Sequence, residues 1–201
     1  ILLLVGIDLM IEQIPNFLDN KDINELDDFL QSINFAWFYN PNIGGGTNEQ
    51  VYINDANVKD TDGFVHMFIE NNVSNSPHDV IIMMLMDNIQ RHIKKPIKDI
   101  LRARASMIKE NSTFGDYYQV PHVDYTTPHY TAIYYVNEAD GDTIFFNEHY
   151  TIEDHSKKTV QQRISPEKGK CIIFNGLQYH TGTVPTKNKR MIININFTLE
   201  D

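Results

Sequence analysis

The chain has 201 residues, 41% of them hydrophobic and 22% charged, with a formal net charge of -10 at pH 7. This composition predicts one globular domain over residues 1–201. The acidic balance disfavours a nucleic-acid partner, because that role needs a basic face. The single cysteine, Cys171, excludes a disulfide framework within the chain and favours a reducing compartment, so we expect a cytoplasmic protein.

The first 18 residues are apolar, but Asp8 and Glu12 interrupt them well short of a membrane span. No basic segment precedes them, so the sequence predicts neither a signal peptide nor a membrane anchor. Because the chain begins with Ile and Met10 offers a natural start, residues 1–9 are expected to be non-native or disordered.

An amphipathic helix is predicted over residues 22–33, where Ile23 and Leu26 lie on one side and acidic residues on the other. The aromatic stretch 35–39 then predicts a strand. The Gly- and Asn-rich stretch 40–50 predicts a mobile loop, which is either a flexible lid or a plain connector.

A second amphipathic helix is predicted after Ser76, with Ser76 as its N-cap, Pro77 at its first position and Pro96 as its stop. Beyond it the sequence shows short strands in succession without helices between them, which implies antiparallel pairing in a sandwich, barrel or jelly roll. The expected strands are 100–108, 130–136, 143–146, 158–164, 170–174 and 190–197.

Two potential metal ligands, His122 and Asp124, lie two residues apart in the stretch VPHVD. On an extended chain this spacing places both side chains on the same face. A polar loop with a chance histidine shows the same spacing, so a third ligand decides between the two interpretations. His180 is the best candidate, because it follows a predicted strand and precedes Arg190 by ten residues.

The other histidines have no such setting. His129 follows His122 across a Pro-containing turn and is not expected to share its face. Surface or capping positions are expected for His66, His78 and His92, and a solvated loop for His149 and His155.

The last predicted strand separates an apolar face from a largely polar one. Its polar face marks either the wet side of an edge strand or the wall of a cavity. In a cavity, the guanidinium of Arg190 is suited to bind a carboxylate through two parallel hydrogen bonds. The apolar face consists of Met191, Ile193, Ile195 and Phe197, and the other face of Arg190, Ile192, Asn194 and Asn196.

Two histidines and one carboxylate on one side of a metal ion, with the remaining positions open, are typical of non-haem Fe(II) oxygenases. A closed tetrahedral zinc site would leave no room for a chelating co-substrate and O2. The charge of such an Fe(II) site, +1, favours an anionic chelating acid.

The order His122-x-Asp124, His180, Arg190 resembles the Fe(II)/2-oxoglutarate-dependent oxygenase superfamily. The stretch TAIYYVNEADGDTIFF is similar to the prolyl-hydroxylase-like branch, and residues 99–198 carry the match. The general texture also resembles small oxygenases encoded by marine bacteriophages, which would work in the host cytoplasm. The resemblance implies a mainly β fold with flanking helices: a double-stranded β-helix, of jelly-roll or cupin-like type, with the N-terminal helices packed on one sheet.

The resemblance also implies roles for single residues. His122, Asp124 and His180 would bind Fe(II), Arg190 would bind the distal carboxylate of 2-oxoglutarate, and Tyr135 would share that carboxylate unless it is a core aromatic. No catalytic residue is expected beyond the metal ligands.

Other assignments are less direct. Asn194 lies on the Arg190 face and is a candidate for co-substrate contact. Ile108 stands where the family carries a tyrosine near the proximal carboxylate, so that contact is not assigned. Trp37 and Tyr39 are candidate substrate contacts, with core packing as the alternative for Trp37.

The implied reaction uses Fe(II), 2-oxoglutarate and O2, with ascorbate as a stimulant in vitro. It hydroxylates an unactivated C–H bond and releases succinate and CO2. A peptidyl residue such as proline is the favoured substrate. Two alternatives stay open: hydroxylation of a free amino acid or small metabolite, and a catalytically silent β-sandwich that binds a ligand or partner. The sequence gives no oligomeric state.

Overall fold

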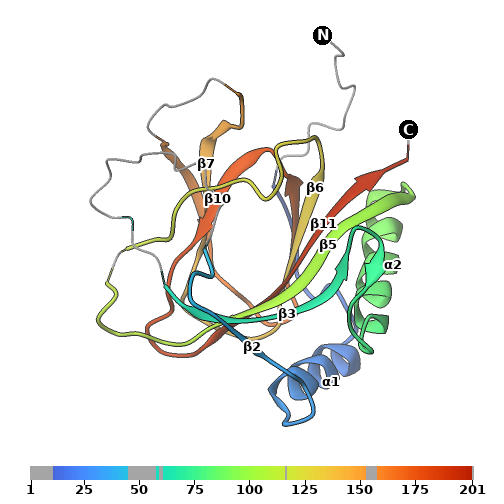
Figure 1. Ribbon diagram of the computed structural model, residues 1–201, viewed down its shortest axis with the longest axis horizontal. Helices are drawn as coiled ribbons and strands as arrows, with labels where there is room; N and C mark the ends of the chain where they lie inside the picture. The colour runs from blue at the N-terminus through green and yellow to red at the C-terminus, as the bar shows by residue number, and fades with distance from the viewer. Residues whose placement is uncertain (1–10, 45–57, 59–60, 116, 153–157, 201) are drawn as a thin grey trace.

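The computed structural model describes residues 11–44, 58, 61–115, 117–152 and 158–200. In this part of the chain two β-sheets and two helices form the fold (Figure 1). The expectations for residues 1–9, for His155 and for most of the Gly-rich loop lie outside the described residues.

The larger sheet has eight strands, in the order β1-β9-β6-β11-β5-β3-β2, with β4 paired to β3. All of its pairings are antiparallel. The long strands β5 and β11 lie at its centre. The strands are β1 (Glu12–Ile14), β2 (Phe38–Asn40), β3 (Gly63–Glu70), β4 (Val73–Ser74), β5 (Ile97–Ile108), β6 (Tyr130–Tyr135), β9 (Cys171–Asn175) and β11 (Arg190–Leu199).

The smaller sheet has three strands in the order β10-β7-β8, which are β7 (Thr143–His149), β8 (Val160–Ile164) and β10 (Gln178–Gly182). The segment between β5 and β6 extends this sheet at two points, because Tyr118 bridges to Thr183 and His122 bridges to His180. Two facing antiparallel sheets of this kind form a double-stranded β-helix, as expected.

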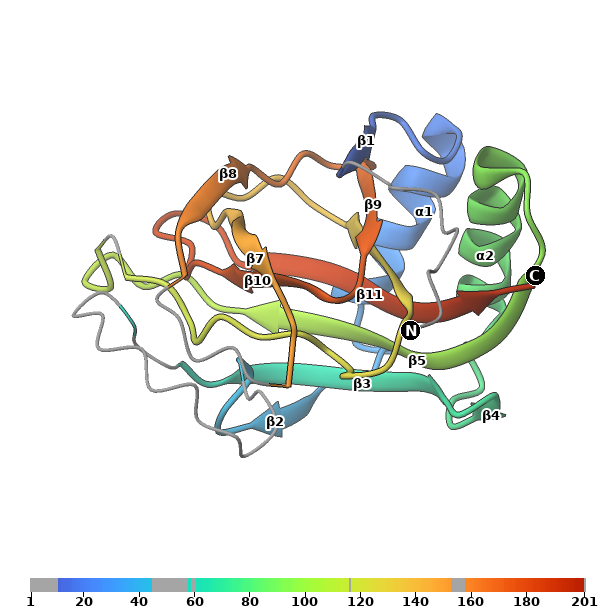
Figure 2. The same ribbon diagram turned by 90° about the horizontal axis from the view of Figure 1, so that it is seen from above.

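Both helices cover the large sheet. Helix α1 (Asn20–Gln31) begins after Asp19, whose carboxylate accepts hydrogen bonds from the backbone N–H groups of Lys21 and Asp22. Helix α2 (Val80–Ile93) ends at Lys94, which adopts a left-handed conformation with φ 56°. Figure 2 shows the two helices side by side behind the large sheet. No helix among the described residues is long and apolar enough to span a membrane.

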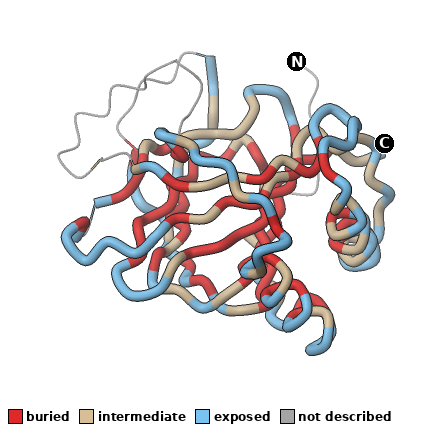
Figure 3. The backbone as a smooth tube through the Cα atoms, turned by 60° about the horizontal axis from the view of Figure 1, so that its bottom comes forward, coloured by how far each residue is buried: buried red, intermediate tan, exposed pale blue. Residues whose placement is uncertain are grey.

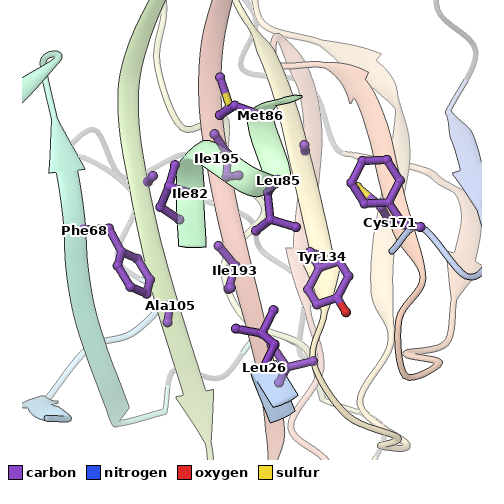
Figure 4. Close-up of a cluster of buried hydrophobic side chains, with 14 of the residues drawn as sticks. Leu26, Phe68, Ile82, Leu85, Met86, Ala105, Tyr134, Cys171, Ile193 and Ile195 are labelled. Atoms are coloured by element: carbon purple, nitrogen blue, oxygen red, sulfur yellow. The ribbon is translucent and has the colours of Figure 1, made fainter. Parts of the chain in front are cut away.

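The main hydrophobic core lies between these helices and the large sheet. Figure 4 shows Leu26 of α1 and Leu85 of α2 directed at side chains of the sheet, among them Ile193 of β11 and Tyr134 of β6. Cys171 lies in the same cluster, and burial raises its pKa, so it is an inert thiol.

A second cluster fills the space between the two sheets. It joins Tyr135 and Ile192 of the large sheet to Phe145 and Ile164 of the small one. Figure 3 shows buried backbone mainly in the middle of the molecule and exposed backbone mainly at its periphery. Ile192 and Ile193 therefore face opposite cores, and the polar side chains of β11 lie on the side of the small sheet.

Three expectations about the N-terminal half were wrong. β3 was not predicted, although it lies between β5 and β2 in the large sheet. Helix α2 begins at Val80 and not at Pro77, since residues 77–79 form a turn and Asp79 is the N-cap. The hydroxyl of Ser76 accepts from the backbone N–H of His78 and bonds the ring of His66. His66 is not at the surface: it is 5% exposed.

Candidate metal centre

The three predicted metal ligands come together at the edge of the small sheet. Ligand atoms of His122, Asp124 and His180 all lie within 4.8 Å of one another. His180 belongs to β10, and His122 pairs with it through two backbone hydrogen bonds of 3.0 Å. Asp124, two residues further, points to the same place, as the spacing predicts.

Hydrogen bonds orient both imidazole rings. The Nδ1 atom of His122 bonds the carbonyl of Val120 at 2.9 Å, and Nδ1 of His180 bonds the carbonyl of Gln178 at 3.0 Å. A carbonyl only accepts, so each Nδ1 carries the proton and each Nε2 presents a lone pair. The Nε2 atom of His180 lies 3.8 Å from the Asp124 carboxylate. This is the donor set that a divalent metal ion requires.

Burial favours the metal-binding form of His180. Removal from water, reinforced by the neighbouring His122, lowers the pKa of His180 to about 4. The imidazole is therefore neutral at neutral pH, and a metal ion does not have to displace a proton from it.

The carboxylate of Asp124 is held by side chains of the large sheet. Arg102 of β5 donates to one oxygen at 2.5 Å, and the amides of Asn194 and Asn196 donate to the other at 3.2 and 2.8 Å. Burial alone would raise the pKa of Asp124, but Arg102, followed by His180, outweighs it and holds that pKa well below its usual range. The carboxylate is thus ionised and fixed in orientation.

Arg190 lies in the same cavity, on the first residue of β11, and is 5% exposed. Its Nη2 donates to the hydroxyl of Thr143 at 2.8 Å, and the hydroxyl of Tyr135 bonds the same oxygen at 2.7 Å. Burial raises the pKa of Tyr135 to about 12, so its hydroxyl stays protonated. Burial lowers the pKa of Arg190, yet an arginine so placed keeps its charge at neutral pH.

Sequence reasoning missed Thr143. The hydrogen bond between the hydroxyls of Tyr135 and Thr143 uses one of their two protons. The bond from Arg190 uses a proton of the guanidinium. One hydroxyl proton of the Tyr135–Thr143 pair is therefore left to donate to a ligand. The Nε of Arg190 is also buried without a partner. Arg190, Thr143 and Tyr135 therefore offer several donors to one anion. Threonine is common in strands, so nothing in the sequence marks Thr143 as a residue of the binding site.

Other polar groups of the cavity wall also lack hydrogen-bond partners among the described residues. They are the Nε of Arg104, the hydroxyl of Ser106, the Nε2 of Gln119 and the Oδ1 of Asn194, all buried. Asn194 points its amide nitrogen at Asp124, so the structure brings it to the metal ligand as well as to the cavity. The surplus of donors suits ligands rich in acceptor oxygens.

The two candidate substrate contacts lie apart from this cavity. Trp37 packs against the helix-side core and donates from its indole to the carbonyl of Leu30 at 3.0 Å, in agreement with the core-packing alternative. Tyr39 of β2 is 62% exposed and contacts Phe64. Ile108 lines the cavity, and as an aliphatic side chain it donates no hydrogen bond there.

Comparison with known proteins agrees with this geometry. The sequence profile of the 2OG-Fe(II) oxygenase superfamily matches residues 109–198. No curated protein sequence matches the chain. Many solved structures share the fold.

A prolyl-4-hydroxylase of Pseudomonas putida is 13% identical, with a TM-score of 0.56, over 95% of this chain and 93% of its own. The viral collagen prolyl hydroxylase of Paramecium Bursaria Chlorella virus-1, solved with 2OG, is 13% identical, with a TM-score of 0.51, over 97% of this chain and 100% of its own. The non-heme alpha ketoglutarate dependent epimerase SnoN from nogalamycin biosynthesis is 10% identical, with a TM-score of 0.62, over 94% of this chain and 76% of its own.

At these identities the structural likeness shows the fold alone, and the profile shows that residues 109–198 are similar to the superfamily. The more specific resemblance to phage oxygenases stays a prediction. The chain thus has the double-stranded β-helix fold and a His-Asp-His set, and its residues 109–198 are similar to the 2OG-Fe(II) oxygenase superfamily, whose dioxygenases use Fe(II), 2-oxoglutarate and O2.

Proposed function

We propose that the protein hydroxylates an unactivated C–H bond of a peptidyl residue such as proline, with conversion of 2-oxoglutarate to succinate and CO2. One observation carries the proposal. Ligand atoms of His122, Asp124 and His180 lie close together, and the two histidines line the same cavity as the buried Arg190, whose Nε has no hydrogen-bond partner among the described residues.

The residues present fit the metal. His122 and His180 would hold Fe(II) through Nε2, and Asp124 through the carboxylate that Arg102 keeps ionised. When bound, Fe(II) supplies the oxidative chemistry, since it couples decarboxylation of 2-oxoglutarate by O2 to hydroxylation of the substrate.

The other residues of the site would place the co-substrate. Arg190, together with the hydroxyl pair of Thr143 and Tyr135, would bind the distal carboxylate. The low exposure of Arg190 and His180 keeps bulk water away from these charges and strengthens the interaction. No side chain is required to move a proton.

The substrate assignment rests on the resemblance to prolyl hydroxylases, including the two structural relatives named for that activity. A free amino acid or small metabolite is the second candidate, and the fold is also that of the alpha ketoglutarate dependent epimerase SnoN from nogalamycin biosynthesis. Trp37 and Tyr39 carry no part of this proposal, because neither residue lines the cavity. The proposal also includes a single domain over residues 1–201 and a cytoplasmic location.

The test begins with the metal. Purified protein with Fe(II) and 2-oxoglutarate, kept free of oxygen, should show a visible charge-transfer band, and His180→Ala should abolish it. With O2 and ascorbate the wild type should form succinate, whereas Zn(II), Co(II) or Ni(II) should occupy the ligands without turnover.

The substrate is then sought among peptides and free amino acids as a product 16 Da heavier. A wild-type protein with no band and no succinate would contradict the proposal and favour a catalytically silent β-sandwich that binds a partner.

A further inference from the structure

A second arginine, Arg104, enters the cavity and has no role in the site described so far. It lies on β5 and lines the cavity together with His122, His180 and Asn194. Its Nε is buried without a hydrogen-bond partner. Within the described ranges, no hydrogen bond or ion pair joins the Arg104 guanidinium to another residue.

The register of the large sheet places Arg104 at the metal ligands and away from the distal carboxylate. Arg104 stands opposite Asn194, whose amide bonds Asp124, whereas Arg190 stands opposite Ile108. The two β5 positions are four residues apart, or ~13 Å along a strand. A dicarboxylate bound to Arg190 at one end and to the metal at the other has no carboxylate left for Arg104. Arg104 is therefore available to bind a group of another molecule.

The charges of the cavity point to the nature of that group. Arg190 would neutralise the distal carboxylate, and Fe(II) with Asp124 would neutralise the proximal one. Arg102 is bonded to Asp124 and stands opposite the acidic Glu70 on β3. After these pairings the positive charge of Arg104 has no counterpart.

Burial of an unpaired guanidinium in the cavity wall costs free energy of folding. Its nearest charged neighbours are Arg102, which repels it, and Asp124, which is already shared. Burial, assisted by Arg102, lowers the pKa of Arg104 to about 10, so it still carries its charge at neutral pH. A partly buried cation with free donors is stabilised most by a carboxylate, which accepts two parallel hydrogen bonds.

We infer that Arg104 recognises a carboxylate of the primary substrate, next to the carbon that is oxidised. The inference rests on the proposed function and narrows its substrate class. The carboxylate belongs either to the oxidised residue itself, as in a free or N-acylated amino acid, or to an acidic side chain beside it in a peptide. Arg104 is thus a specificity-determining residue.

Binding to the Ni(II) protein saturated with 2-oxoglutarate tests this without turnover. The probes are two matched pairs: N-acetyl-L-proline with its amide, and the N-acetyl dipeptide amide Pro-Asp with Pro-Asn. The first pair reports a carboxylate on the oxidised residue, and the second a neighbouring side chain. In the wild type the acid of at least one pair should bind about tenfold or more tightly than its neutral partner, as expected for a bidentate contact.

The variants Arg104→Met and Arg104→Gln should abolish this preference, while the affinity for 2-oxoglutarate stays within about threefold of wild type. Two substitutions are used so that a folding defect in one does not decide the result. Arg91→Met is the control, because Arg91 is exposed on α2 and makes only an ion pair with Asp87 at 3.7 Å. It should keep the full preference.

Two results would overturn the inference. One is a wild type that binds both members of each pair equally. The other is an Arg104→Met protein that keeps the preference, or that loses affinity for 2-oxoglutarate in its place, since Arg104 would then belong to the co-substrate. Failure of the wild type to bind Ni(II) and 2-oxoglutarate at all would contradict the proposed function as well.

Discussion

Thr143 contacts both Arg190 and Tyr135, the two residues to which the resemblance assigned the distal carboxylate of 2-oxoglutarate. Its hydroxyl bonds both side chains, so it fixes the arginine and adds a donor of its own to the pair. The Thr143 hydroxyl holds the planar guanidinium group of Arg190 in one orientation before the ligand binds.

Thr143→Val should therefore weaken 2-oxoglutarate binding without loss of the metal. The substitution keeps the shape of the side chain and removes the hydroxyl, which leaves Arg190 and Tyr135 without their shared partner. We expect a loss of about 1 to 2 kcal/mol, or roughly 5- to 30-fold in affinity. Titration of the Ni(II) protein with 2-oxoglutarate measures it. Thr143→Ser keeps the hydroxyl and should bind nearly as wild type; equal binding by Thr143→Val would remove Thr143 from the site.

Arg190 should contribute more than Thr143 to the affinity for 2-oxoglutarate, because its side chain is positively charged. Arg190→Leu would leave the distal carboxylate unpaired in a buried cavity, at a cost of ~2 to 4 kcal/mol, or roughly 30- to 1,000-fold in 2-oxoglutarate affinity. Metal affinity measured without co-substrate should stay nearly unchanged. Arg190→Lys should fall between, since an ammonium keeps the charge and loses the fork. Wild-type affinity in Arg190→Leu would mean that the cavity binds its acid elsewhere.

Among the elements, β11 shows how far pattern alone reaches. Its strict alternation predicted two faces, and the structure confirms them: Met191 and Ile193 face the helices, while Arg190 and Asn194 face the cavity. The strand is long and central, and each of its sides has one uniform environment. Under these conditions period-2 patterning is decisive.

Four of the described strands, β1, β3, β4 and β10, were not predicted. For β3 and β10 the reason can be identified. In β3 the pairing shifts register between Met67 and Ile69, so buried side chains do not alternate regularly along it. β10 is five residues long and has the polar sequence QYHTG, which reads as a turn although every residue in it is buried. Its position beside His122 depends on contacts between distant segments, which no local pattern records. The metal set was predicted from the two-residue spacing of His122 and Asp124, from the place of His180 ten residues before Arg190, and from the resemblance to the oxygenase superfamily.

The connection between β2, β3 and α2 depends on His66. Its Nδ1 donates to the carbonyl of Ala36, and its Nε2 bonds the Ser76 hydroxyl, both at 2.7 Å. Burial lowers the pKa of His66 below 6.5, so the unfolded chain binds the proton more readily than the folded one. The stability that depends on neutral His66 is therefore complete above the ordinary pKa of histidine and is lost as pH falls below it.

His66→Gln should make the free energy of unfolding less dependent on pH. Urea denaturation at pH 7.5, 6 and 5 should show a smaller decline toward acid than in wild type, although the variant is less stable at pH 7.5. The matched control is His149→Gln on the exposed end of β7, which should keep the wild-type decline. Parallel pH profiles for wild type and His66→Gln would show that His66 does not titrate during unfolding.

For the whole molecule, the metal ligands join two sheets that also meet through a cluster of apolar side chains and through the hydrogen bonds of Thr143 with Arg190 and Tyr135. His180 belongs to the small sheet, whereas Asp124 is fixed by Arg102 and Asn196 of the large sheet. A metal ion bound to both, and a co-substrate bridging that ion to Arg190, would close the cavity by contacts that the unfolded chain cannot make. Ligand binding should therefore stabilise the fold as a unit.

Ni(II) and 2-oxoglutarate together should raise the melting temperature of protein first stripped of metal with a chelator. At 100 times its dissociation constant, a ligand that binds only the folded state adds about 2.7 kcal/mol, which for a chain of this size corresponds to roughly 5 to 10 °C. Thermal unfolding with metal alone, and with metal and co-substrate, separates the two steps. Arg190→Leu should keep the shift caused by metal and lose the further shift caused by 2-oxoglutarate, whereas His180→Ala should lose both. A wild type stabilised by 2-oxoglutarate in the absence of metal, to the same extent as in its presence, would mean that the acid binds without chelation and that the two sheets are not linked through the metal.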